Sequence, residues 1–108
     1  MVPILAKQAV NKKMEFKASK LLGAYEFFYA AGFLGGYMGL SLGKELPPEE
    51  IQENIRANSG AITNAKDDIL YLYNQFVQFS VEDMPKVEDK DVLEGLFEDG
   101  YLDGGKRQ

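Results

Sequence analysis

Apolar residues recur along the chain in alternating steps of four and three, in two series of equal length. This spacing places the residues of each series on one stripe of a helix. The first series runs from Met14 to Leu42 and contains no charged residue. The second runs from Ile51 to Phe79, with Asn58 as its only polar member. Two heptad-spaced stripes of equal length are typical of an antiparallel helical hairpin.

Proline marks the break between the two series. The pair at 47–48 cannot continue a helix, and the glutamates that follow favour a helix start because their charges face the positive end of the helix dipole. We therefore predict an all-α hairpin, with a long helix over residues 4–43 and a second helix over residues 48–80. The Asn-Ser-Gly stretch at 58–60 can end a helix as easily as lie within one, so a break there stays open.

A third, short helix is expected over residues 88–98. Its apolar residues fall on one side, and a glycine follows its predicted end. The remaining residues, 99–108, are acidic and rich in glycine, which is typical of a flexible tail. The sequence thus predicts one helical domain over residues 1–98.

The two long helices also match in side-chain size when the second is folded back on the first. This register opposes Gly39 to Ile55 and Gly32 to Ile62. Large residues opposite small ones allow two helices to interdigitate at a constant separation. The residues predicted to pack the hairpin are Gly32, Gly35, Gly39, Ile55, Ile62, Ala65, Phe28 and Phe76.

The glycine-rich stretch at 32–43 has more than one interpretation. Its glycines form overlapping Gly-x-x-x-Gly spacings, which mark helix association in membranes. The segment 21–43 is long enough to span a bilayer and carries one charge, Glu26. We favour a helix packed against protein, with membrane insertion of this glycine zipper as the alternative. A β-hairpin that turns at 35–36 is less favoured, because its flanks do not alternate.

The first predicted helix is apolar on more than one face, so one neighbouring helix cannot cover it. We therefore expect a non-enzymatic structural protein that forms a homo-oligomer or docks into a larger assembly. Small virion or secretion-apparatus components have a similar outline, and this analogy favours a cytoplasmic or virion-associated location. The residues predicted to form the partner or oligomer interface are Phe27, Phe33, Leu34, Tyr37 and Met38.

Charge is divided unevenly along the chain. Residues 1–44 carry a net charge of +4 and residues 45–108 a net charge of −9. The acidic half disfavours nucleic-acid binding, which depends on neutralising phosphates with Lys and Arg. Lys12, Lys13, Lys17 and Lys20 form a basic stripe. This stripe is suited to anionic lipid or to the acidic half of a neighbouring copy.

The acidic C-terminal helix has a functional interpretation of its own. It resembles a peptide ligand in which apolar anchors sit among carboxylates. Its anchors would be Leu93, Leu96 and Phe97. This pattern predicts, as a further alternative, a small regulator that binds one protein target.

The residue types present exclude most catalytic chemistries. The chain has no cysteine and no histidine, which removes the usual nucleophile–base pairs and the commonest zinc ligands. Glu15 and Glu26 lie three turns apart on one predicted helix, too far to act as an acid–base pair. We expect no catalytic residue, metal site, cofactor or small-molecule substrate.

Overall fold

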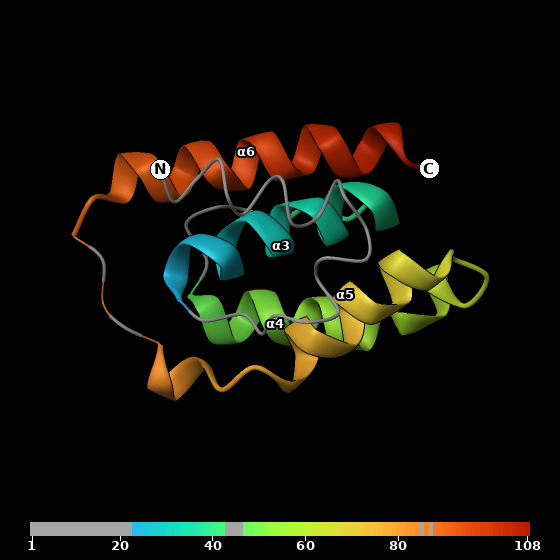
Figure 1. Cartoon of the computed structure of the whole chain (residues 1–108), viewed down its shortest axis with the longest axis horizontal. Helices are drawn as coiled ribbons and strands as arrows, with labels where there is room; N and C mark the ends of the chain where they lie inside the picture. The colour runs from blue at the N-terminus through green and yellow to red at the C-terminus, as the bar shows by residue number, and fades with distance from the viewer. Residues whose placement is uncertain (1–22, 43–46, 85, 87) are drawn as a thin grey trace.

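The computed structural model describes residues 23–42, 47–84, 86 and 88–108, and every regular element within these ranges is helical. The predicted all-α fold is confirmed. Figure 1 shows helix α3 between α6 on one side and α4 with α5 on the other. The part of the predicted first helix before Gly23, with its basic stripe, lies outside the described residues.

Helix α3 spans Ala24–Met38 and ends at Gly39. Gly39 has a φ of 74°, in the left-handed region that glycine adopts at little cost, and its N–H donates to the carbonyls of the preceding turn. The N–H of Leu40 donates to the carbonyl oxygen of Gly35 at 2.9 Å and completes the cap. The predicted continuation to residue 43 is therefore wrong, and so is a continuous glycine-zipper helix over 21–43.

The second predicted helix is divided in two. Helix α4 spans Pro48–Ala57 and begins at the proline pair, as expected. A 3₁₀ turn, η1 (Ser59–Ile62), follows it, and helix α5 spans Asp67–Gln78. The break near 58–60, which the sequence left open, is confirmed.

Helices α4 and α5 are antiparallel, and polar side chains join them. The amide Nε2 of Gln52 donates to the carbonyl oxygens of Phe76 at 2.9 Å and Phe79 at 2.8 Å. The guanidinium of Arg56 donates to the carbonyl oxygen of Val77. The last carbonyls of a helix have no partner within the helix, so these two α4 side chains complete the end of α5.

Helix α6 spans Lys90–Lys106, and a second short 3₁₀ turn, η2 (Val81–Asp83), precedes it. Asp89 caps α6 by accepting a hydrogen bond from the N–H of Val92 at 3.2 Å. The helix was predicted to end at residue 98, with a flexible tail after it. That prediction is wrong, because α6 continues through these residues, and Gly100 and Gly104 of the supposed tail pack against α3.

The core lies where α3 meets the α4–α5 pair and the inner side of α6. The rings of Phe27 and Phe76 stack with centroids 4.7 Å apart, and Phe79 lies beside Phe27 at 5.6 Å. Aromatic pairs at such distances stabilise a core beyond their buried area. The other large side chains that are fully buried are Tyr29, Phe33, Leu34, Ile51, Ile55 and Ile69.

Candidate functional site

The most unusual feature of the described residues is the contact between the backbones of α3 and α6. A Cβ added at Gly32 would lie 2.9 Å from the carbonyl carbon of Phe97 and closer still to its oxygen. A Cβ at Gly36 would meet the backbone of Tyr101 in the same way. Real Cβ atoms do not approach backbone atoms this closely, so only glycine fits at either position of α3.

The glycines of α6 repeat this arrangement in the opposite direction. A Cβ at Gly100 would lie against the carbonyl oxygen of Tyr29 and 2.8 Å from the N atom of Phe33. A Cβ at Gly104 would lie against the carbonyl oxygen of Phe33 and 2.9 Å from the N atom of Tyr37. Residue numbers rise together along both helices, so α3 and α6 are parallel. Each glycine directs a Cα hydrogen at a carbonyl of the other helix, a weak bond of about 0.5–1 kcal/mol.

One partly buried polar pair crosses this interface. The hydroxyl of Tyr29, whose side chain is fully buried, donates to Oδ2 of Asp103 at 2.5 Å. Burial raises the pKa of Tyr29 far above its ordinary value of 10.0, and the hydrogen bond to the Asp103 carboxylate raises it further. The tyrosine therefore stays neutral and acts as a hydrogen-bond donor that fixes the register of the two helices.

Further bonds secure the C-terminal end of α6. Tyr101 donates its hydroxyl to the carbonyl oxygen of Leu40 at 2.8 Å. Gln108 donates to the carbonyl oxygens of Gly36 and Tyr37 at 3.2 and 2.9 Å, which belong to the last turn of α3.

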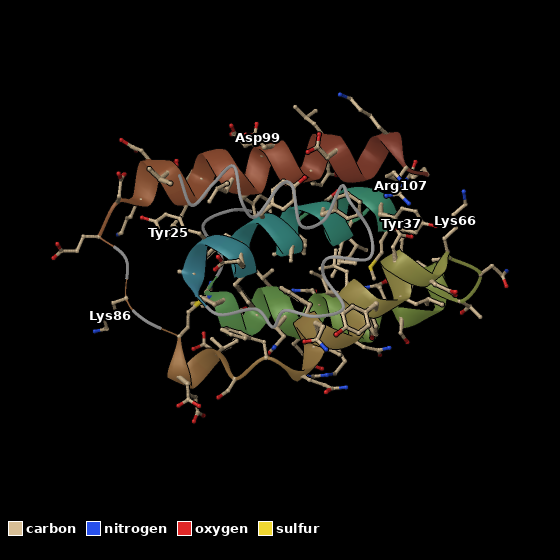
Figure 2. All side chains as sticks on the ribbon, in the orientation of Figure 1. Tyr25, Tyr37, Lys66, Lys86, Asp99 and Arg107 are labelled. Atoms are coloured by element: carbon tan, nitrogen blue, oxygen red, sulfur yellow. The ribbon has the colours of Figure 1, made fainter. Side chains whose placement is uncertain are left out.

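An ion pair connects the same end of α6 to α5. Arg107 donates to Asp68 at 2.9 Å, and the Asp68 side chain is only 7% exposed. Figure 2 labels both Arg107 and Tyr37 at this end of the helix pair. Two neighbouring helices therefore hold the last residues of the chain in place.

The residues predicted to pack the hairpin are divided among several places. Gly32 faces α6 and not Ile62, and Gly39 is the cap of α3 and does not face Ile55. Gly35 has Leu42 and then Tyr101 as its nearest neighbours. The remaining predicted packing residues do belong to the core or its edge: Ile55, Ile62 and Phe76 are buried, and Phe28 and Ala65 pack against them.

The residues predicted to bind a partner are covered by the chain itself. Phe27, Phe33 and Leu34 are fully buried, and Tyr37 and Met38 are partly buried against the core. Within one chain they form no exposed surface, because α6 covers one side of α3 while α4 and α5 cover another.

The predicted peptide-ligand anchors are not exposed either. Leu96 and Phe97 are buried, and Leu93 is half-buried. Leu96 and Phe97 lie on the side of α6 that packs into the core, whereas Figure 2 shows Asp99 on the side that faces away from α3. As α6 is packed here, Leu96 and Phe97 belong to the core of the same chain.

Several residues of this interface were not identified from the sequence, namely Tyr29, Gly100, Tyr101, Asp103 and Gly104. One signal could have found the glycines, because Gly100 and Gly104 have the same four-residue spacing as Gly32 and Gly36. No comparable signal marks Asp103, whose role depends on a tyrosine far away in the sequence.

Two further properties concern the described part of the chain. No group of three or more Asp and Glu residues there is placed to hold a metal ion. No helix within the same residues is both long and apolar enough to cross a bilayer.

A family model described as a domain of unknown function, DUF3837, matches residues 1–104, so the chain belongs to that family. No curated protein and no solved structure matches the chain.

Proposed function

We propose that this protein is a non-enzymatic helical assembly protein, whose α3 takes part in self-association or in docking into a larger complex. The observation that carries the proposal is the contact between the backbones of α3 and α6. Gly-x-x-x-Gly faces that let two backbones meet are devices of helix association. In this chain such a face is present on both helices.

The polar groups of the interface support the same reading. The group whose pKa departs most clearly from its ordinary value, Tyr29, donates to Asp103 and holds two helices together. Perturbed groups often mark catalytic sites, but structural networks perturb pKa values as well. The bond across the helix pair gives Tyr29 a structural role.

The division of charge along the chain favours contact between copies. Residues 1–44 are net positive by four charges, and residues 45–108 are net negative by nine. Two copies can therefore place unlike charges opposite each other, which accelerates and orients their encounter. Association of this kind weakens as salt is added.

The molar mass of the purified full-length chain, measured by light scattering over a range of concentrations, tests the proposal. We expect one defined multiple of the 12.1 kDa chain that dissociates on dilution. Raising the salt concentration should shift the equilibrium towards the single chain. A mass of 12.1 kDa at every concentration would rule out self-association and leave only docking to a different protein.

A further inference from the structure

Helices α3 and α6 carry the same sequence motif. Residues 24–38 and 92–106 align without a gap, and each residue of the second segment lies 68 positions after its counterpart in the first. The shared motif is Glu-x-x-aromatic-x-x-Gly-aromatic-Leu-x-Gly, where x is any residue. Its matching positions are Glu26 and Glu94, Tyr29 and Phe97, Gly32 and Gly100, Phe33 and Tyr101, Leu34 and Leu102, and Gly36 and Gly104.

The contacts between the helices obey the same equivalence. Gly32 faces the carbonyl of Phe97, and its counterpart Gly100 faces the carbonyl of Tyr29, which is the counterpart of Phe97. In the same way, Gly36 faces the carbonyl of Tyr101, and its counterpart Gly104 faces the carbonyl of Phe33, which is the counterpart of Tyr101. A local two-fold axis therefore runs between the parallel helices. In a dimer of identical subunits, a two-fold axis makes each contact occur twice with the partners interchanged. Here the same arrangement occurs between two helices of one chain.

The equivalence ends on the outer sides of the pair. Leu34 is fully buried, whereas its counterpart Leu102 is 64% exposed. The alanines at 30 and 31 correspond to Glu98 and Asp99 on α6. The two helices are therefore similar in the residues that face each other and differ in the residues on their outer sides.

We propose that α6 is exchanged between two copies of this chain, so that α6 of each copy packs on α3 of the other. This inference rests on the proposed self-association. It also explains how α3 can mediate association although its apolar residues are covered, because the covering helix is then supplied by the second copy. The exchanged pair retains every contact described above, including the bond between Tyr29 and Asp103.

The connection to α6 suits such an exchange. Among the described residues α6 packs mainly on α3, and its ion pair to α5 is Arg107 with Asp68. Residues 79–89 separate α5 from α6, and such a segment spans at most roughly 36–40 Å when fully extended. Exchange of a helix on a connection of this length keeps the interface and changes only which copy supplies the helix.

Fluorescence transfer between labelled copies tests the exchange directly. The chain contains no cysteine, so Ser41→Cys and Leu102→Cys each introduce a single label site at an exposed residue. The two sites belong to one α3–α6 unit, because Leu40 accepts the hydroxyl of Tyr101. One batch carries a donor at residue 41, a second carries an acceptor at residue 102, and the two are unfolded, mixed and refolded.

With exchange, the mixed batches contain dimers with the shorter donor–acceptor distance, because donor and acceptor lie in one helix pair formed by two chains. A chain that carries both labels, diluted into unlabelled chains, then has its labels in two different helix pairs and shows the lower transfer per labelled dimer. The reverse pattern in a dimer overturns the exchange and leaves self-association intact. The reverse pattern at a mass of 12.1 kDa overturns both.

Complementation provides a second test with a matched control. Gly32→Ala damages α3 and Gly100→Ala damages α6, and each variant alone contains a clash in every helix pair. With exchange, refolding the two together yields heterodimers in which one helix pair has no added methyl group and the other has both. Because one clash already separates the two backbones, a second clash in the same pair should cost less than the first. We therefore expect part of the mixture to unfold at a higher urea concentration than either variant, and a curve equal to the sum of the two overturns the proposal.

Gly95→Ala and Gly105→Ala are the control variants. An added Cβ at either position has no neighbour within 4 Å, although both lie on the same helix as Gly100. Each should fold alone, and mixing them should leave the unfolding curve unchanged. A change on mixing these controls would show that the gain does not come from the pairing surface, and it would overturn the complementation argument.

Discussion

The two helix pairs of this protein are built in opposite ways. In α3 and α6 glycines remove the side chain at the points where the backbones touch, and the helices are parallel. In α4 and α5 the helices are antiparallel and are joined by long side chains, such as Gln52, which reaches the end of α5. The first pair is therefore intolerant of atoms added at the glycines of its contact, and the second is sensitive to the loss of atoms already present.

The largest effect is expected where α3 meets the second pair. Phe76→Ala removes a fully buried ring that stacks on Phe27, and it should destabilise the fold by about 3–5 kcal/mol. Urea unfolding at a fixed protein concentration measures this loss. Leu102→Ala, at an exposed position, is the matched control and should change the stability by no more than about 0.5 kcal/mol. Equal effects of the two would contradict the assignment of the core.

An added methyl group should break the other pair. Gly36→Ala places a Cβ against the backbone of Tyr101, which cannot rotate away, so we expect a loss of about 3 kcal/mol, the upper end for overpacking. Gly95→Ala, in open space on α6, should instead stabilise the helix by about 0.5–1 kcal/mol. Urea unfolding compares the two, and an unharmed Gly36 variant would mean that the backbones are not in contact.

Tyr29→Phe should cost about 2 kcal/mol at pH 7, because it removes a hydrogen bond to a carboxylate. Since folding raises the pKa of Tyr29, the folded chain keeps this proton while the unfolded chain loses it above its ordinary value of 10.0. The unfolded state then binds fewer protons, so this contribution is complete below pH 10 and declines above it by about 1.4 kcal/mol per pH unit.

Unfolding of the wild type and of Tyr29→Phe at pH 7 and pH 11 measures this dependence. The difference in unfolding free energy between them should shrink at pH 11, because the phenylalanine variant lacks the titrating hydroxyl. A difference that stays constant would mean that Tyr29 ionises equally in the folded and unfolded chain.

The smallest effect is expected at the polar bridge of the second pair. Gln52→Met keeps the side-chain length but removes the donor to Phe76 and Phe79, and it should cost about 1 kcal/mol. Hydrogen exchange should accelerate in the last turn of α5 but not in α6. Gln78→Met, at an exposed position of α5, serves as the control and should leave both measurements unchanged.

Local chemistry made much of the fold predictable. The helical period of the apolar residues indicated an all-α chain, and the Pro-Pro-Glu-Glu stretch after residue 46 marked the start of α4. Asn58 and its neighbours carried the signal for the break before α5. Each of these features depends on a residue and its immediate neighbours, which is why they are readable from the sequence.

The glycines show what local sequence could not predict, namely which of them lie inside a helix and which end one. Gly36 lies inside a helix and Gly39 ends it, yet both occur in the same short glycine-rich stretch. Gly100 was predicted to follow the end of a helix, but it lies in the middle of α6. Glycine disfavours a helix by about 1 kcal/mol at each position. At Gly36 and Gly100, contact with the backbone of the other helix offsets that cost.

The amino-acid sequence by itself determined the helical class, the position of the proline break and the uneven charge, because propensity, periodicity and composition are local properties. Tertiary structure alone decided that α6 covers the glycine face of α3 and that Asp103 accepts the hydroxyl of Tyr29. These contacts join residues about seventy positions apart. Their energy depends on shape at the meeting point, where a single Cβ would separate the helices.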